Sequence, residues 1–583
     1  MTGKDVSDVR YAFVDTSRYP ADEQPLAIDK VRYIGDEVAA VAAISEEVAE
    51  EALRLIKVNY EVLPAATTVE EALASDAPAI HEQNLEGTSA WEDWGAAEKK
   101  GSAEQRPKNV SAQTNVCFGD VEQGFAEADY VRSDRFETAA TAHCALEPHA
   151  AVASYDPVTG KLDLWLSTMG IFLKRFVLSK ALKLPIGKVR VRHSYVGGAF
   201  GGKIDVFPYE FCAAFLSKKC GQPVKFELSR EEVFMTTRQR HPVVIEIKTG
   251  AKKDGTLVAQ DIRVTVDNGG YRGSGAIIAF LCHGFSFPIY RVPNYRYEGL
   301  AVYTNNPIRG PQRGHGAPQI RFAIDSQIDL IARDLGLDPI DVMLKNVRHK
   351  GDVLPNGDVL NSCGLTDGLH GVISSMEWKS KRQANHRDGK SRYKRGLGVS
   401  LCAMFSGAMY YPFASAAMVK MHDDGSVTLF TGTQEMGQGA YTTLSQVGQC
   451  RRAERPAAAG AAHGQLCGQL PHRGFGHGPG GIFTCGYGQP AGSCQRSGTA
   501  TRKSAGDRDL GGNLGDNHAL RCGAAGAGQQ DHGGTADSGP DRSNRGPVLC
   551  GDRSASGSAG ALGRYPGQES EAGAAGLGGR GHL

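Results

Sequence analysis

The chain has 583 residues, of which 41% are hydrophobic and 22% charged, and its formal net charge is +1. This length allows several domains, and the balanced charge excludes the strongly basic surface typical of nucleic-acid or anionic-membrane partners. The first residues lack a charged segment followed by an apolar one, and no stretch reaches the roughly 18 apolar residues of a membrane span. We therefore expect a soluble, cytoplasmic protein with no nucleic-acid or membrane partner.

The N-terminal region predicts a small α/β unit over residues 1–66. Residues 31–44 alternate as a pair of strands, Ser45 can cap a helix, and residues 57–64 alternate as a further strand. The unit begins abruptly, as though its first strands were missing. Residues 67–118 follow as a linker, with a polar stretch that contains two tryptophans, Trp91 and Trp94.

The next region, residues 119–375, is rich in predicted strands. A helix is expected at 172–183, a hairpin turns at Lys253-Asp254-Gly255, and two helices lie within 321–347. Residues 390–447 begin another unit, with a hairpin that turns at Asp424-Gly425. The predicted fold class is α+β with several mixed sheets.

The composition changes sharply at residue 448. Glycine makes up about a quarter of residues 448–583. This stretch contains one isoleucine, one valine and one lysine, namely Ile482, Val548 and Lys503. So few large apolar side chains cannot offset the entropy of ordering the chain, and we expect a disordered tail. Because GC-rich codons read out of frame give this composition, we favour a frameshift over a natural disordered extension.

The 13 cysteines are scattered and include no C-x₂-C pair. Closely spaced cysteines hold zinc and iron–sulfur clusters, so no such cluster is expected in this chain. Cys212 and Cys220 flank an apolar helix and are expected in the core.

Three glycine-bearing loops stand at the boundaries of predicted elements. The first glycine loop is Val196–Lys203 (VGGAFGGK), the second is Arg313–Gln319 (RGHGAPQ), and the third is Thr433–Gly439 (TQEMGQG). Clustered glycines let backbone N–H groups approach an anion, and helix N-termini favour negative charge. Each loop alone is most often a structural turn, and the first is neither a Walker A loop nor a dinucleotide-binding fingerprint. Together they suggest the walls of one extended anionic ligand.

In this order the loops resemble those of the molybdopterin-binding subunits of the xanthine oxidase / aldehyde oxidase family. Residues 35–65 resemble the small α/β hammerhead domain that precedes them, and the resemblance runs from about residue 3 to Val447. It implies a hammerhead domain followed by mixed-sheet molybdopterin-binding domains. It also implies molybdenum bound as molybdopterin, expected as the cytosine dinucleotide, with separate iron–sulfur and FAD-binding partner subunits.

The resemblance further implies roles for the loop residues. Phe200 and Gly201 would lie beside the metal, and Arg313 would place its backbone near the metal ligands. Gly437 and Gln438 would hold the pterin and its phosphate, and His315 would contact substrate. The full set of expected cofactor-binding residues is Gly198, Phe200, Gly201, Gly202, Arg313, Gly314, Met436, Gly437, Gln438 and Gly439. No protein metal ligand is expected, because the pterin supplies the sulfur ligands.

The sequence departs from the family pattern at several of these positions. Met169 stands where a glutamine often donates a hydrogen bond, which a thioether cannot do. Ile204 follows the lysine where xanthine-specific members carry glutamate, and residues 280–288 contain no arginine. Purines are therefore disfavoured, and Gly314 excludes the copper-binding cysteine of carbon monoxide dehydrogenases. The second loop with Asn361–Leu365 most resembles the hydroxybenzoyl-CoA reductase branch.

The catalytic glutamate of the family, a general base in a Gly-Glu motif, is missing. The tail offers only Glu454, Glu569 and Glu571, none in such a motif. The leading hypothesis is therefore a molybdenum oxidoreductase subunit that is inactive as encoded. Its reaction would be hydroxylation or reductive dehydroxylation of an aromatic, heterocyclic or aldehyde substrate. The alternative is a non-catalytic remnant or binding module that no longer holds cofactor.

Two further groups are interpreted as structural. His143 and Glu147 lie four residues apart, but Pro148 interrupts the segment, so we expect a satisfied structural pair rather than metal ligands. Arg238, Arg240 and His241 form a basic cluster, for which a solvated or interface position is expected.

Overall fold

The computed structural model describes residues 1–13, 21–82, 108–193, 195–355, 357–387, 395–405, 416–424, 426–453 and 482–483. The chain divides into two compact units, Met1–Val548 and Leu549–Leu583, and every described residue belongs to the first. The tryptophans of the expected linker and nearly all of the expected disordered tail lie outside the described residues. Within them, no helix has both the length and the apolar character needed to cross a bilayer.

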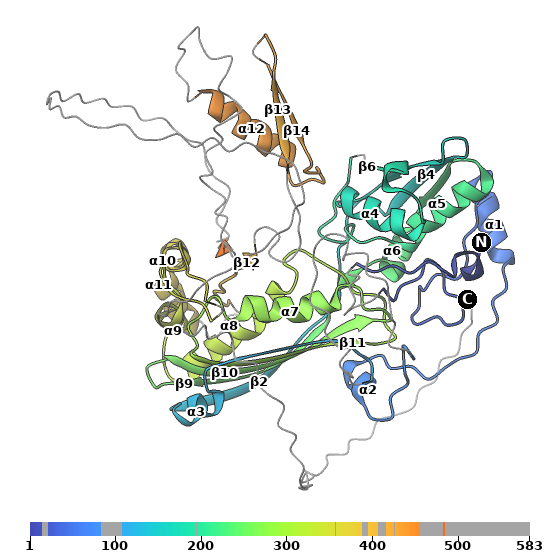
Figure 1. The fold of residues 1–583 in the computed structure, drawn as a ribbon. Coiled ribbons are helices and arrows are strands. Elements are labelled where there is room, and N and C mark those ends of the chain that lie inside the picture. Colours follow the sequence, from blue (N-terminus) through green and yellow to red (C-terminus); the bar gives the residue numbers. More distant parts are fainter. Residues whose placement is uncertain are drawn as a thin grey trace, which may run out of the picture. The chain divides into compact units, whose positions relative to one another are not determined.

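The larger sheet has five strands in the order β1-β11-β10-β9-β2 (Figure 1). Only β10 and β11 are parallel, and the helix α7 connects them. The hairpin predicted at 253–255 forms and joins β9 to β10. Its turn includes Gly255, whose φ of +83° is easily adopted by glycine. The strands are β1 Val110–Phe118, β2 Tyr130–Thr138, β9 Val243–Ala251, β10 Leu257–Gly269 and β11 Asn294–Tyr303.

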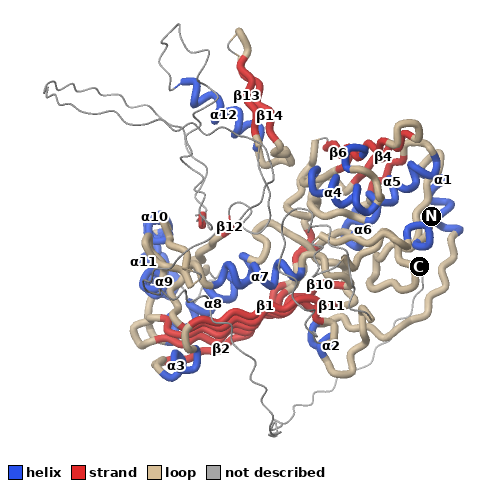
Figure 2. The backbone as a smooth tube through the Cα atoms, viewed as in Figure 1, coloured by secondary structure: helices blue, strands red, loops and turns tan. Residues whose placement is uncertain are grey.

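Helices cover both faces of this sheet. Figure 2 shows α7 (Gly275–Ser286) and α8 (Ala317–Asp334) on one face, with α3 (Val121–Ala126) on the other. Alternate residues of β9 and β10, such as Ile245 and Val264, are fully buried against α7 and α8. This apolar layer is the main core, and it fixes the start of α8, where the second glycine loop ends.

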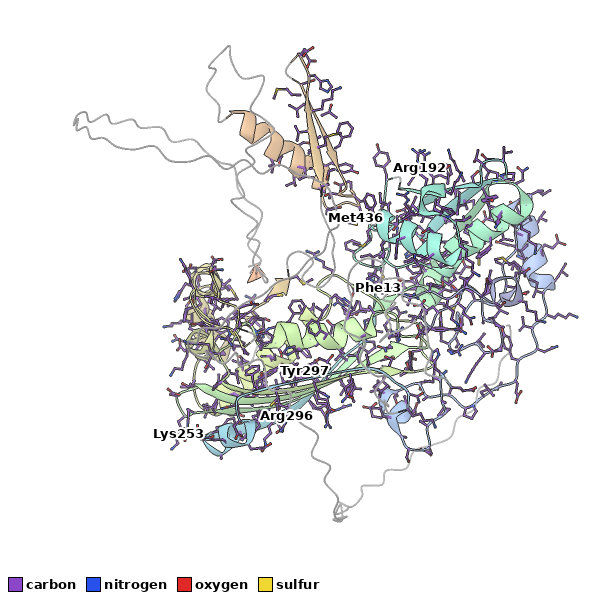
Figure 3. All side chains as sticks on the ribbon, in the orientation of Figure 1. Phe13, Arg192, Lys253, Arg296, Tyr297 and Met436 are labelled. Carbon is purple, nitrogen blue, oxygen red and sulfur yellow. The ribbon has the colours of Figure 1, made fainter. Side chains whose placement is uncertain are left out.

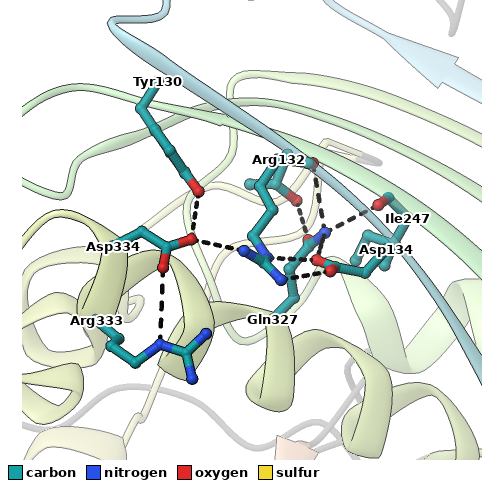
Figure 4. Close-up of polar contacts among 8 residues, drawn as sticks. Tyr130, Arg132, Asp134, Ile247, Gln327, Arg333 and Asp334 are labelled. Carbon is teal, nitrogen blue, oxygen red and sulfur yellow. Dashed lines mark hydrogen bonds and ion pairs between the residues drawn. The ribbon is translucent and has the colours of Figure 1, made fainter.

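A polar network ties the end of α8 to strand β2 (Figure 4). The Tyr130 hydroxyl donates to Asp334 at 2.6 Å, and Arg132 donates to the same carboxylate at 2.6 Å. Arg132 also forms an ion pair with Asp134, and the Gln327 amide donates to the Ile247 carbonyl at 2.9 Å. These contacts set the register of the helix on the sheet.

The smaller sheet has four strands in the order β6-β5-β4-β7. Helix α4 (Ile171–Ala181) connects the parallel strands β5 and β6, and α5 (Pro208–Cys220) follows the first glycine loop. Cys212 is buried as expected, whereas Cys220 is exposed because it ends the helix. The strands are β4 Ala150–Asp156, β5 Lys161–Leu166, β6 Val189–His193 and β7 Val224–Glu227.

The N-terminal region differs from the prediction. The helix α1 (Glu46–Leu55) forms, and Ser45 caps it by accepting from the Val48 amide. Within residues 21–82, all of which the structure describes, the strands predicted at 31–44 and 57–64 do not form, and Ala39 makes only an isolated bridge, with Thr2. Alternating side chains are not sufficient for a strand, because a strand also needs a partner for its backbone groups.

The expected linker, residues 67–118, contains ordered elements at both ends. Helix α2 (Val69–Leu73) begins with a capping box from Thr68, and β1 pairs with β11 from Val110 to Phe118. The boundary expected at 118 is therefore corrected, because the five-stranded sheet already begins at 110.

The remaining elements are short or complete the connections. The hairpin predicted around Asp424 forms between β13 (Ala417–Met421) and β14 (Val427–Thr431). The others are η1 Gly3–Val6, β3 Thr141–Ala142, η3 Ile186–Lys188, α6 Arg230–Thr236, β8 Gln239–Arg240, α9 Pro339–Asn346, α10 Leu365–Met376, α11 Trp378–Arg387, β12 Met404–Phe405, α12 Ala440–Ala453 and β15 Ile482–Phe483.

Candidate functional site

The first glycine loop lies between β6 and α5 in a strained conformation. Phe200 has a φ of +50°, which is unusual for a residue with a side chain, and its side chain is 50% exposed. Gly201 has a φ of +101°, and a Cβ there would lie 2.5 Å from the Pro311 carbonyl oxygen. Only glycine therefore allows the first loop to approach the segment that leads into the second.

The structure brings the first and second glycine loops together. The Arg313 amide donates to the Phe200 carbonyl at 2.9 Å, although the two residues are far apart in the sequence. Gly314 and Gly316 both have positive φ angles as the second loop turns into α8. The bond joins Phe200, which was expected beside the metal, to Arg313, whose backbone was expected near the metal ligands.

In the basic cluster, which was expected at a solvated or interface face, Arg238 and His241 are buried and Arg240 is half-buried. Arg240 donates to the Arg313 carbonyl at 2.6 Å and to the Gln312 side chain, so it holds the second loop from below. Burial lowers the pKa of Arg240. The expectation of a solvated face was wrong for Arg238 and His241. For Arg238 the reason is that two carboxylate partners distant in sequence, Asp205 and Glu23, enclose it.

Arg238 of this cluster is among the largest fully buried side chains. It donates to Asp205 at 2.6 Å and to Glu23 of the N-terminal region. Burial raises the pKa of Glu23, although Arg238 opposes the shift. The ion pair thereby connects the N-terminal region to the segment just after the first loop.

His143 and Glu147, expected as one structural pair, have separate hydrogen-bond partners. The two ring nitrogens of His143 lie 3.1 and 2.8 Å from the carbonyl oxygens of Arg238 and Pro311. Glu147 contacts the first loop through Gly197 and Lys203. Across the part of the chain that the structure describes, no cluster of three or more histidine, cysteine or acidic side chains could hold a metal ion.

His315, the expected substrate residue, lies beside a second histidine. Its Nε2 is 3.3 Å from the Ser274 hydroxyl, and its ring centroid is 5.8 Å from that of the fully buried His241. Burial lowers the pKa of His315 to about 3, so the ring is neutral at neutral pH. A neutral imidazole can stack or hydrogen-bond but carries no charge for an anionic substrate.

The third glycine loop lies between β14 and α12, where Figure 3 labels Met436. Glu435 accepts from the amides of Gly437 and Gly439 at 2.9 Å each and from Tyr441 at 3.1 Å. These backbone hydrogen bonds hold the pKa of Glu435 below its usual value, and the bond from the Tyr441 amide has the largest effect. The amides expected to meet an anionic cofactor are therefore bonded to Glu435, which sequence analysis did not single out.

The residue just before the third loop, Gly432, lies near the start of α4. A Cβ on Gly432 would lie 3.6 Å from Phe172, near the start of α4. Just before that helix, the Met169 amide donates to the Lys203 carbonyl at 3.2 Å. Met169, where the sequence departs from the family pattern, is thus fixed directly against the first loop.

These residues fit a cofactor that brings its own metal ligands. The Gly201 position leaves no room for a side chain, and an exposed Phe200 is held beside it by the second loop. Residues 196–203 and 313–319 themselves include no cysteine, aspartate or glutamate. The third loop could bind an anionic cofactor only if the Glu435 carboxylate released the amides of Gly437 and Gly439.

Three family models match the chain. The aldehyde oxidase and xanthine dehydrogenase a/b hammerhead domain matches residues 1–64, and molybdopterin cofactor-binding domains match residues 102–347 and 372–449. The last match ends at 449, beside the composition change at 448.

Curated relatives and solved structures agree with these matches. The xanthine dehydrogenase molybdenum-binding subunit of Escherichia coli O157:H7 is 33% identical over 76% of this chain and 57% of its own length. The nicotinate dehydrogenase large molybdopterin subunit of Eubacterium barkeri is 36% identical over 60% of this chain and 76% of its own length. Quinoline 2-oxidoreductase from Pseudomonas putida 86 superposes with a TM-score of 0.66 at 26% identity, covering 77% of this chain and 56% of that one. The chain thus spans little more than half the length of several relatives that it matches.

Proposed function

The chain belongs to the xanthine oxidase family of molybdopterin-binding large subunits, and from that premise we propose that it is the cofactor subunit of a molybdenum oxidoreductase. The proposed reaction is hydroxylation or reductive dehydroxylation of an aromatic, heterocyclic or aldehyde substrate. The observation that carries the proposal is the hydrogen bond from the Arg313 amide to the Phe200 carbonyl. It brings two loops of the family pattern to one place, although more than a hundred residues separate them.

The cofactor is proposed to be molybdopterin cytosine dinucleotide. When bound, it would supply the redox-active metal and the sulfur ligands of that metal. Phe200 and Gly201 would pack beside the metal, with Arg313 and Gly314 opposite them. Gly198 and Gly202 would bind the cofactor through their backbone, because a Cβ there would meet Phe200 and His143, respectively. Met436 to Gly439 would bind the pterin phosphate once Glu435 releases the amides of Gly437 and Gly439.

The substrate is proposed to be something other than a purine. Ile204 and Met169 cannot supply the polar contacts of a carboxylate or an amide. Neutral His315 would offer a flat ring and one hydrogen-bond donor to an aromatic or heterocyclic substrate. This specificity depends on the proposed position of His315 in the substrate pocket.

The electron-transfer partners are proposed to be an iron–sulfur subunit and an FAD-binding subunit. Relatives named as subunits of larger dehydrogenases, such as the gamma subunit of the 6-hydroxypseudooxynicotine dehydrogenase complex of Paenarthrobacter nicotinovorans, support separate chains. Turnover as encoded is proposed to be absent, because no glutamate stands in the family's Gly-Glu motif. Glu454, Glu569 and Glu571 lie outside the described residues.

The cofactor proposal is tested by releasing the bound group from the purified full chain with its partner subunits. Acid oxidation should give a fluorescent pterin and CMP in equal amounts. Pterin without CMP would contradict the dinucleotide form, and no pterin would favour the non-catalytic remnant. Translating the other frames beyond codon 447 tests the frameshift; a Gly-Glu motif is expected in one of them, and its absence from both would contradict it.

A further inference from the structure

Glu147, in the turn before β4, contacts both ends of the first glycine loop. Its Oε2 accepts from the Gly197 amide at 2.5 Å and from the Lys203 ammonium at 3.0 Å. Lys203 also donates to the Glu147 carbonyl at 2.9 Å, and the Glu147 amide donates to the Gly197 carbonyl at 3.2 Å. One residue therefore holds the beginning and the end of the loop.

The contact between Glu147 and Lys203 is largely shielded from solvent. The Lys203 side chain is fully buried, whereas Glu147 is 30% exposed. Burial lowers the pKa of Lys203, and the hydrogen bond to Glu147 opposes that shift. A buried ammonium that loses its carboxylate partner is strongly unfavourable, so removing the Glu147 carboxylate should destabilise Lys203 in this position.

At the other end of the loop, Gly197 packs closely against the Glu147 side chain. A Cβ on Gly197 would lie 2.6 Å from the Glu147 Cβ, so the backbone of the loop packs directly on this side chain. Between the two ends, Phe200 holds its left-handed φ of +50°. A strained residue of this kind persists only where the surrounding structure determines its conformation. The Arg313 amide fixes the middle of the loop, and Glu147 fixes both ends.

We propose that Glu147 is a positioning residue for cofactor binding: its carboxylate clamps Gly197 to Lys203 and so presents Phe200 and Gly201 in the shape that receives the cofactor. The inference rests on the proposed function for its link to the cofactor, but the clamp itself concerns the loop alone. Glu147 is distinct from the family's general base, because its carboxylate is already engaged by an amide and an ammonium.

The test compares Glu147→Gln with the wild-type full chain and its partner subunits. Hydrogen exchange followed by mass spectrometry should show amides of residues 196–203 exchanging about ten-fold faster or more, since a charged hydrogen bond is lost. Protection in the five-stranded sheet should stay the same. Pterin per chain should fall by at least half. The matched control is Glu298→Gln, which removes a similarly exposed carboxylate from Arg263 on that sheet and should change neither quantity.

Two further variants keep the inference falsifiable if Glu147→Gln folds poorly. Glu147→Asp retains the charge for Lys203 and should lose less pterin than Glu147→Gln, whereas Gly197→Ala should reproduce the loop exchange with Glu147 intact. Unchanged exchange in 196–203, or faster exchange with wild-type pterin content, would overturn the inference. A uniform loss of protection across the chain would show a purely structural role and would also overturn it. Wild-type chain without pterin would overturn the proposed function and the cofactor role together, while the exchange arm still reports the clamp.

Discussion

Gly201 packs against the backbone of the segment that leads into the second glycine loop. Its φ is +101°, and a Cβ at this position would lie 2.5 Å from the Pro311 carbonyl oxygen, which leaves no space for alanine. Gly201→Ala should lower the free energy of unfolding by about 1–2 kcal/mol from the backbone alone, with more from the clash. Urea denaturation measures this. Gly187→Ala, with nothing within 4 Å, is the control and should change it by less than about 0.5 kcal/mol.

Glu435 occupies the amides that the proposal assigns to the cofactor phosphate. Glu435→Ala should therefore speed amide exchange at Gly437, Gly439 and Tyr441 several-fold in chain without cofactor, because their acceptor is gone. Pterin content should be retained, since the phosphate would take the vacated amides. Exchange at these amides is followed by mass spectrometry. Loss of pterin in Glu435→Ala would show that the carboxylate is part of the binding site instead.

At the scale of elements, Arg238 joins parts of the chain that are distant in sequence. Its partners Asp205 and Glu23 lie 33 and 215 residues away, and all three side chains are buried. Arg238→Met should destabilise the fold by about 3–5 kcal/mol, because it leaves two buried carboxylates without a cation. Arg296→Met breaks exposed ion pairs on the sheet and should cost less than about 1 kcal/mol. Equal urea midpoints for the two variants would show that the buried ion pairs add nothing to stability.

The same ion pair shows where sequence reasoning stops. The hairpin at 253–255 and the helices α8 and α9 could be predicted, because periodicity and turn residues are local signals. The burial of Arg238 could not, since neither carboxylate partner is near it in the chain. Strands at 57–64 were expected from alternation, but pairing is not encoded in one segment. The first and second loops were identified from their glycines, whereas Glu147, Arg240 and Glu435 act through contacts that no local pattern reveals.

At the scale of the whole molecule, buried neutral histidines predict acid sensitivity. Burial lowers the pKa of His149 to about 3 and of His283 to about 4, and it also lowers the pKa of His241. Above pH about 6.5 both folded and unfolded histidines are neutral, so their full contribution to stability is present. As the pH falls below that value, only the unfolded chain takes up protons, and stability is lost towards the folded pKa values.

Each of these histidines should therefore cost up to about 1.4 kcal/mol of stability per pH unit between pH about 6.5 and 4. Urea midpoints measured across that range should fall steadily. In His149→Gln the slope of the unfolding free energy against pH should be smaller, by an amount that corresponds to about one fewer proton taken up on unfolding. A slope identical to that of the wild type would show that His149 is already protonated or accessible in the folded chain.

The first and second glycine loops are central to the proposed function, because together they would bind a molybdenum-containing pterin. The molybdenum content of the full chain, purified with its partner subunits, can be measured by mass spectrometry of the metal. We expect a molar ratio approaching one molybdenum per wild-type chain and a ratio at least several-fold lower for Gly201→Ala. A wild-type chain without molybdenum, or equal ratios in the two proteins, would show that these loops do not bind the cofactor.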